Sequence, residues 1–448
     1  MKRIKPNIKF VGLHGHSTAG SPGDAIGYPQ EHMEYVWNNG MDSFALTDHG
    51  NMNGLGYQII HAKKMIAEGR DFKPIFGTES YFIDSIDDWK NLYEEHKSQS
   101  KVKSAEKTSG IIMENEDETK QKKFNPLNTR SHLILLAQNE VGLKNLYKLV
   151  SSSFDSENFY RYPRMDFKML QEHSEGVIAS SACLGSRLAK PIWDSQDGDE
   201  TKILDEMVEV ADKFHTIFGD RFYLELQWNA IPEQHKFNKY LIRVSEQLGI
   251  PLISTADSHY PGPLLWKDRT LYKKMAWLSR SNVDTSLPGS VDELGYELYP
   301  KNGDQMWEDY KRYSRLQGVE YDDTLVRDSL ERTHHIAHER IKSFFPDNSI
   351  KLPSFVVPEG MTATQSLASS CIQSLKKKGL HTHKEYVDRL KYELEVIHKR
   401  DFSKYFLTMK ALVDKAENKC LAGPGRGSAA GALSSYYSSR SNQMESTV

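Results

Sequence analysis

The sequence has 448 residues, a formal net charge of −3 and three cysteines, Cys183, Cys371 and Cys420. A chain of this length predicts two or more domains, and its charge balance predicts no partner, so nucleic-acid binding would need local basic faces. Three scattered cysteines exclude a disulfide framework and favour a reducing compartment, so we expect a cytoplasmic protein. The sequence shows no signal peptide and no membrane span.

The first feature with chemical meaning is a pair of histidines, His14 and His16, directly after the apolar run 8–11. Side chains two residues apart in a strand share a face, so a strand ending here would aim both imidazoles into the same space. A lone histidine is usually a satisfied polar or surface residue. A second pair, Asp257 and His259, closes another apolar run much later in the chain. We interpret the two pairs as parts of one polynuclear metal site.

Between these pairs, short apolar runs alternate with helical patterns. With the run 8–11, seven strands are expected, the others at 43–47, 74–76, 133–137, 177–180, 222–227 and 251–255. One expected helix carries Phe237, Leu241 and Val244 on one face and ends at Gly249. This alternation predicts an α/β fold, a small distorted barrel with its chemistry at the carboxyl ends of the strands.

Ligand-type side chains accompany several of these strands, namely Asp24, His49, Glu79, His132 and Cys183. His132 stands before its strand and fits the carboxyl-end pattern less well. Mixed imidazole, carboxylate and thiol groups suit Zn²⁺, Mn²⁺ or Fe²⁺ better than Mg²⁺. Together with the two end pairs they exceed one tetrahedral site, so we expect two or three ions. Such ions activate water for phosphoester hydrolysis; the alternative is a zinc cluster that only stabilises the barrel.

Composition changes twice along the chain. Residues 84–130 are rich in Lys, Glu, Ser and Asn, which predicts a mostly solvated, partly helical insertion. Past about Pro263 helical periodicity dominates; the stripe containing Leu390 and Ile397 and the stripe containing Phe406 and Met409 are both expected to be core. The expected divisions are 1–265, 266–437 and a polar tail at 438–448.

The last informative stretch is the glycine-rich run from Gly423 to Gly431. Its small residues let backbone N–H groups approach an anion closely, and Arg426 and Ser428 add a charge and a hydroxyl. An ordinary flexible loop is the alternative. The position of Arg426 and Ser428 inside the run, ahead of an apolar segment, favours a phosphate cradle.

Together these motifs resemble the polymerase-and-histidinol-phosphatase (PHP) domain, in the version that opens bacterial or phage-type DNA polymerase III alpha subunits. The likeness is carried by His14-x-His16-Ser17, Thr47-Asp48-His49-Gly50, Gly77-Thr78-Glu79, His132, Ser181-Ala182-Cys183 and Asp257-Ser258-His259-Tyr260. Residues 386–406 resemble the palm region of that subunit, and 423–431 resemble its Gly-Pro-Gly-Arg-Gly-Ser-x-Ala-Gly loop. The similarity covers about residues 8–437 apart from the charged insertion.

The resemblance implies a distorted (β/α)7 PHP barrel followed by a mainly helical, partial polymerase palm. It implies a set of metal ligands: His14, His16, Asp24, His49, Glu79, His132, Cys183, Asp257 and His259. Among them Glu79 and Asp257 would be the catalytic carboxylates of a 3′→5′ exonuclease. Gly425, Arg426, Gly427 and Ser428 would hold the triphosphate of an incoming nucleotide. Asn229 stands where some relatives have a histidine.

The match departs from the family after Tyr437, where no counterpart of the polymerase's catalytic aspartates follows; the only acid after Ser428 is Glu445. We therefore expect no primer extension by this chain alone, with Mg²⁺-dependent polymerisation only alongside the missing part. Expected partners are DNA, a second polypeptide carrying the remaining palm and fingers, and other replisome subunits, with no membrane. The alternatives are a freestanding PHP phosphatase of a small phosphoester and a non-catalytic scaffold for a partner polymerase or nuclease.

Overall fold

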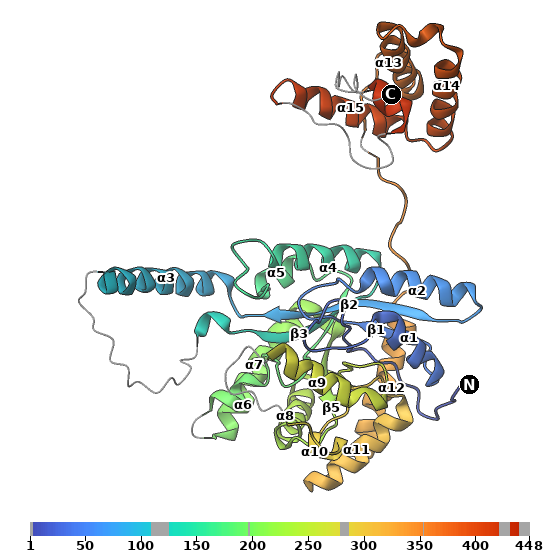
Figure 1. Ribbon diagram of the computed structural model, residues 1–448. Helices are drawn as coiled ribbons and strands as arrows, with labels where there is room; N and C mark the ends of the chain where they lie inside the picture. Colours follow the sequence, from blue (N-terminus) through green and yellow to red (C-terminus); the bar gives the residue numbers. More distant parts are fainter. Residues whose placement is uncertain are drawn as a thin grey trace. The chain divides into compact units, whose positions relative to one another are not determined.

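The computed structural model describes residues 3–108, 125–195, 198–277, 286–352, 354–420 and 431–438. It divides the chain into two compact units, Met1–Pro346 and Asp347–Val448. The first unit contains the sheet and the second contains helices (Figure 1). None of the described helices is both long and apolar enough to cross a bilayer.

The sheet of the first unit has six strands that follow one another in chain order. They are β1 (Ser43–Leu46), β2 (Lys73–Phe82), β3 (Ser131–Ala137), β4 (Val177–Ser180), β5 (Phe222–Gln227) and β6 (Leu252–Thr255). β3 is antiparallel to both of its neighbours, and the other pairs are parallel. The sheet is therefore mixed, and β3 is the strand that runs against its neighbours.

The two edges of the sheet are linked by the segment around His14 and His16. The N–H of Ala45 in β1 donates to the carbonyl of Gly12 at 2.9 Å, and the N–H of His16 donates to the carbonyl of Ser258 at 2.7 Å. A Cβ at Gly15 would lie 2.5 Å from the ring of Phe44, so only glycine allows this approach. The curled sheet is thus completed by isolated bridges, and the strand expected at 8–11 is not formed.

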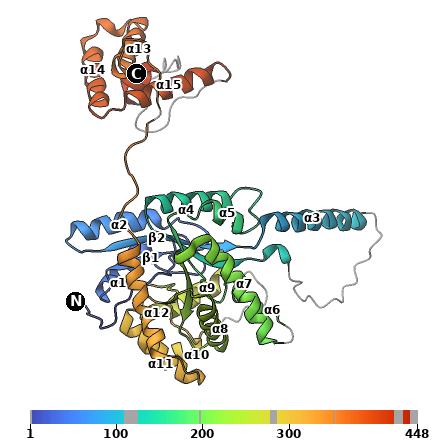
Figure 2. The same ribbon diagram turned by 180° about the vertical axis from the view of Figure 1, so that it is seen from behind.

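Helices surround the sheet of the first unit, with α2, α4 and α5 on one side and α7, α8 and α12 on the other (Figures 1 and 2). Their bounds are α1 Pro29–Asn38, α2 Leu55–Ala67, α4 Glu140–Ser153, α5 Phe167–Glu172, α6 Lys190–Asp194, α7 Glu200–Phe218, α8 Pro232–Leu248, α9 Trp266–Trp277, α10 Val291–Leu294, α11 Gly303–Gln317 and α12 Asp323–His335. The predicted helix with Phe237, Leu241 and Val244 is α8, and those residues are buried. It ends at Gly249, whose φ of +68° suits glycine.

The charged insertion begins with the long helix α3 (Ile86–Thr108), which extends away from the sheet (Figure 1). Its first turns carry Ile86 and Trp89, which form a small buried cluster with Leu127. The prediction of a partly helical insertion is confirmed for this described part. Residues 109–124 of the insertion lie outside the described residues.

The first unit continues well past the expected division at residue 265. Val326 and Leu330 of α12 are fully buried in the main core. Ser329 of α12 shares a hydrogen bond of 2.7 Å with Ser254 of β6. The helical pattern after 265 marks a change of element type, but these helices cover the barrel, so the compact unit ends at Pro346.

The second unit packs α13 (Ala363–Lys377), α14 (Lys384–Lys399), α15 (Ser403–Glu417) and α16 (Leu433–Ser438). Leu390 and Ile397 of α14 are buried, which confirms their predicted stripe. In α15 the buried residue is Leu407, whereas Met409 is 42% exposed, so that stripe was wrong at Met409. The glycine-rich residues 421–430, with the four expected triphosphate ligands, and the tail 439–448 lie outside the described residues.

Candidate metal centre

The structure brings all of the predicted metal ligands together around one point of the barrel. His14 and His16 lie on the edge-linking segment, and Asp24 lies in the loop after it. The remaining ligands are His49 after β1, Glu79 in β2, His132 in β3, Cys183 after β4, and Asp257 and His259 after β6. Residues far apart in the sequence therefore share one site.

The reversed direction of β3 explains the position of His132. Because β3 is antiparallel to β2, its first residues pair with the last residues of β2, and His132 lies opposite Tyr81. This places Nδ1 of His132 2.9 Å from Oε1 of Glu79. Glu79 lies within β2, which runs to Phe82 and is longer than predicted.

Glu79 is the common neighbour of most of these side chains, and it is fully buried. Its Oε2 lies 2.5 Å from Nδ1 of His49, and its Oε1 lies 3.4 Å from Nε2 of His14. The Sγ of Cys183 is 3.8 Å from Oε1 of Glu79 and 3.5 Å from Nδ1 of His132. One carboxylate thus touches imidazoles from three different elements.

Asp257 faces the histidine pair from the opposite edge of the sheet. Its Oδ1 lies 3.1 Å from Nε2 of His14 and 3.2 Å from Nε2 of His16. Its backbone has a φ of +48°, a strained value for a residue with a side chain, and such strain often accompanies functional sites. The backbone carbonyl of Asp257 also lies 2.8 Å from Nδ1 of His259, which orients that ring.

Asp24 completes the group from the loop after His16. Its Oδ2 lies 3.4 Å from Nε2 of His49 and 3.4 Å from Nε2 of His259. Its Oδ1 is held by Arg269 at 2.5 Å and Lys273 at 3.0 Å, both from α9. The carboxylate therefore has one oxygen toward the histidines and the other toward cations.

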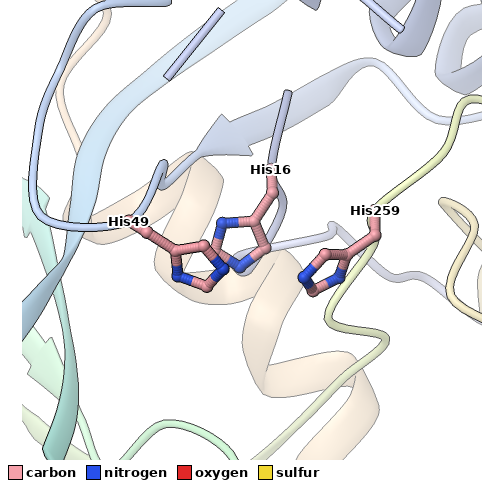
Figure 3. A group of neighbouring side chains, drawn as sticks. All are labelled: His16, His49 and His259. Atoms are coloured by element: carbon pink, nitrogen blue, oxygen red, sulfur yellow. The ribbon is translucent and has the colours of Figure 1, made fainter. Parts of the chain in front are cut away.

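The ligand atoms form three overlapping sets, each with all atoms within 4.8 Å of one another. The sets are His16, His49 and His259; His14, His16 and Glu79; and His49, Glu79 and His132. Figure 3 shows the three rings of the first set pointing toward one another. The ring centroids of His16 and His49 are 4.1 Å apart. His16, His49 and Glu79 each belong to two sets, an arrangement that suits adjacent ions sharing ligands.

These residues fit a divalent metal, because several buried polar atoms among them have no hydrogen-bond partner. Nδ1 of His49, Oε2 of Glu79 and Oδ1 of Asp257 are in this state among the described residues. Their contacts are ion pairs within the cluster, between His49 and Glu79 at 2.5 Å and between Asp257 and His14 at 3.1 Å, without well-aligned hydrogen bonds. Coordination to cations would satisfy all three atoms at once, and imidazole, carboxylate and thiol donors suit borderline metals.

The electrostatics of the cluster depend on the same contacts. Burial and the neighbouring His49 and His259 hold the pKa of His16 well below its usual range, which favours the neutral ring that metals bind. Burial opposes ionisation of Glu79, but the histidines around it hold the pKa of that carboxyl well below its usual range. Burial also raises the pKa of the Cys183 thiol, and a bound cation would have to displace its proton.

Sequence reasoning missed Glu225, a fully buried carboxylate in the middle of β5. Its Oε1 lies 2.7 Å from Nδ1 of His14 and accepts a hydrogen bond of 2.6 Å from Thr255. Ser180 donates to its other oxygen at 2.7 Å. A carboxylate on the far nitrogen of a metal-binding histidine fixes the ring's tautomer. The sequence signal that could have identified Glu225 is its position between Leu224 and Leu226 in a predicted strand.

Asp48 is a second buried carboxylate, next to His49, and it organises the backbone rather than joining the three ligand sets. It accepts hydrogen bonds from the N–H of Ser17 at 2.7 Å and from the hydroxyl of Ser21 at 2.9 Å. Burial raises the pKa of Asp48 to about 6. Its role is to hold the loop that follows His16.

Both units of the chain are similar to known proteins. A family model described as the PHP domain matches residues 12–229, and one described as the bacterial DNA polymerase III alpha NTPase domain matches residues 365–442. DNA polymerase III subunit alpha of Aquifex aeolicus is 32% identical over 95% of this chain and 33% of its own length. The subunit of Borreliella burgdorferi is 30% identical over 96% of this chain and 32% of its own length.

Among solved structures, a two-domain protein from Bacteroides vulgatus containing a predicted PHP-like metal-dependent phosphoesterase aligns over 58% of this chain and 57% of that chain. The alignment has a TM-score of 0.28 at 15% identity.

The first unit contains a PHP domain over residues 12–229, the range that the family model matches. Over 95% of its length, the chain is similar to DNA polymerase III alpha subunits at about 30% identity. It spans about a third of the length of the curated relatives it matches.

Proposed function

We propose that the metal centre of the PHP domain hydrolyses phosphodiester bonds of DNA as a 3′→5′ exonuclease. The observation that supports this most directly is the sharing of His16, His49 and Glu79 between overlapping ligand sets. Adjacent ions that share ligands are the arrangement that clamps the attacking and leaving oxygens of a phosphoryl transfer. Two or three Zn²⁺, Mn²⁺ or Fe²⁺ ions are the proposed complement.

Each residue has a proposed role. Glu79 and Asp257 are the catalytic carboxylates that position the ions, and the imidazoles, Asp24 and Cys183 complete the coordination. The bound ions would lower the pKa of a water molecule and stabilise negative charge on the phosphate. Glu225 acts through His14 by holding Nδ1 of that ring, and Asp48 acts by holding the loop after His16.

The role of the whole protein is also a proposal, because the relatives are about three times as long. We propose that DNA is the substrate, and that the loop containing Gly425, Arg426, Gly427 and Ser428 binds a nucleotide triphosphate. Mg²⁺-dependent polymerisation would require a second polypeptide segment with the remaining palm and fingers, with other replisome subunits as further partners.

A metal-stabilised scaffold is the second candidate, and the burial of the centre favours it. His16 and Glu79 are fully buried, and 13% of the Asp257 side chain is exposed, whereas the outer ligands His132 and Asp24 have 22% and 31% of their side chains exposed. A buried core of this kind is typical of structural metal clusters, whereas catalytic sites keep an open position. The two candidates differ in whether the loaded protein turns over a phosphodiester.

The test uses the purified chain loaded with Mn²⁺ or Zn²⁺ and an oligonucleotide labelled at its 5′ end. The exonuclease predicts a ladder of products shortened from the 3′ end. The double variant His16→Ala with Asp257→Asn should abolish the ladder while the helical circular dichroism is retained. Glu209→Gln, an exposed change on α7, is the matched control. Cleavage that persists in the double variant would contradict the proposal, and a loaded, folded protein without cleavage would favour the scaffold.

A further inference from the structure

Helix α9 forms one wall of a cavity of about 410 Å³ beside the metal centre. The side chains that matter for its chemistry are Arg269, Lys273 and Lys274 from α9, with Ser286, Glu293 and Tyr296 from the segment that follows. None of these residues belongs to the predicted metal-ligand set or to the sequence motifs described above.

The cavity is connected to the metal centre through Asp24. Two of its lining side chains, Arg269 and Lys273, contact Oδ1 of Asp24, while Oδ2 of the same carboxylate faces His49 and His259. The side chain of Arg269 is only 4% exposed, and its Nε also donates to the backbone carbonyl of Asp24 at 2.8 Å. The hydroxyl of Tyr272 accepts the N–H of Gly23 at 3.0 Å, which fixes α9 against this loop.

The charge in the cavity is positive, whereas the whole chain carries a net charge of −3. Three cations line it against one carboxylate, Glu293, whose Oε2 accepts the N–H of Gly289 at 2.7 Å. Within the part of the chain that the structure describes, Lys274 pairs with no carboxylate and donates to the backbone carbonyl of Ser286. A concave surface with excess positive charge attracts anions. In nucleic acids these anions are the backbone phosphates, which lysine and arginine side chains contact.

We propose that this cavity binds the backbone phosphate next to the scissile one, so that the metal centre acts on a polynucleotide strand rather than on a phosphomonoester. Lys274 is the cation of this cavity whose charge no carboxylate neutralises, because its partner is the neutral carbonyl of Ser286, whereas Arg269 and Lys273 are held by Asp24. The inference rests on the proposed function for its chemistry, but the binding of the strand is measurable without turnover. Lysine and arginine contacts to phosphate do not read the sugar, so DNA and RNA strands should both bind.

The experiment measures fluorescence anisotropy of a labelled oligo(dT) strand, and in a parallel arm of oligo(U), with the full chain carrying Glu79→Gln to prevent cleavage. Adding Lys274→Ala should raise the dissociation constant roughly 3- to 10-fold and reduce the slope of log K against log salt by about one. Lys274→Glu should raise it further. Lys267→Ala, an exposed lysine on the same helix outside the cavity, is the matched control and should change neither quantity.

A turnover arm separates this inference from the proposed function. With the otherwise unaltered chain, Lys274→Ala should lower the ratio of kcat/KM for oligo(dT) to kcat/KM for the p-nitrophenyl ester of thymidine 5′-monophosphate, again by roughly 3- to 10-fold. Equal binding by Lys274→Ala and Lys267→Ala overturns the inference. Absence of turnover on both substrates, with Lys274-dependent strand binding intact, contradicts the proposed exonuclease and leaves the phosphate site supported.

Discussion

The two compact units differ in what they bury. The first buries carboxylates and imidazoles at its centre, among them Glu79, Glu225 and His16. The second has a core of aliphatic side chains and Cys371, with Glu393 as its buried acid among the described residues. Burying a charge costs free energy unless it is paired, so a concentration of buried charge needs a compensating role.

Glu393 and Glu79 show the difference at the level of single atoms. Both oxygens of Glu393 have partners, Arg389 at 2.7 Å and the N–H of Ser434 at 2.8 Å, so this acid is accounted for by structure alone. Oε2 of Glu79 has no hydrogen-bond partner although Nδ1 of His49 lies 2.5 Å away. Glu393 is thus paired within its own unit by one cation and one backbone N–H, whereas Glu79 is surrounded by imidazoles that are themselves candidate metal ligands.

Metal removal should break the comparison most strongly. At a free ion concentration a thousand times the dissociation constant, each occupied site raises the free energy of unfolding of the first unit by about 4 kcal/mol. The second unit has no such cluster among its described residues. A chelator should therefore lower the unfolding temperature of the first unit and leave that of the second unchanged, as measured by calorimetry with and without the chelator. Equal shifts in both transitions, or none, would contradict this assignment.

A pair of leucine substitutions should sharpen the comparison from the side of packing. Leu390→Ala in α14 and Leu241→Ala in α8 both remove buried side chains and should each cost about 2–5 kcal/mol. Leu390→Ala should unfold the smaller second unit while metal content is unchanged. Leu241→Ala should destabilise the unit that holds the metal. Loss of metal from Leu390→Ala at a temperature where Leu241→Ala retains it would contradict the independence of the two cores.

Much of the fold could be predicted because the spacing of apolar residues shows which side of a strand or helix is buried. The strand 222–227 and the helix ending at Gly249 are where the pattern placed them. Periodicity carries no information on strand direction, so the sequence gives no sign that β3 is antiparallel, and the reason why His132 precedes its strand appears only in the fold. It also does not show which surface a helix covers, which is why α12 was assigned away from the barrel that it completes.

The site was predictable to the extent that ligand-type residues at strand ends signal it. Glu225 was missed because it lies mid-strand, and its meaning appears only when β5 brings it to His14. Arg269 and Lys273 were missed for a related reason. They follow the last motif on an ordinary-looking charged helix, and only the fold places them on Asp24.

Glu225→Gln tests whether the buried charge in the first unit serves the metal. The amide keeps the shape but loses the negative charge that holds Nδ1 of His14, and loss of such partners typically weakens metal binding about 10- to 100-fold. Competition with a chromophoric chelator measures the affinity. Glu209→Gln on the surface of α7 serves as the control. Unchanged affinity with a correctly folded barrel would assign Glu225 to packing only.

Metal affinity should also rise with pH, by at most about tenfold per pH unit for each proton displaced. Burial lowers the pKa of His49, but Glu79 and Asp24 together raise it to about 10. The ring is therefore protonated at pH 8 and must lose its proton to coordinate a cation, so binding releases protons below pH 10. Titration calorimetry in two buffers of different ionisation enthalpy counts them. Zero proton release at pH 8 would contradict this.

The most direct test of the account is anomalous X-ray diffraction from crystals of the metal-loaded chain, recorded on both sides of the absorption edge of the loaded ion. We expect two or three anomalous peaks within coordination distance of His14, His16, His49, Glu79 and Asp257, with at least one carboxylate or imidazole residue shared between neighbouring ions. Occupied crystals with a single peak away from Glu79, or with no peak among these residues, would contradict the polynuclear centre on which the proposed hydrolysis depends.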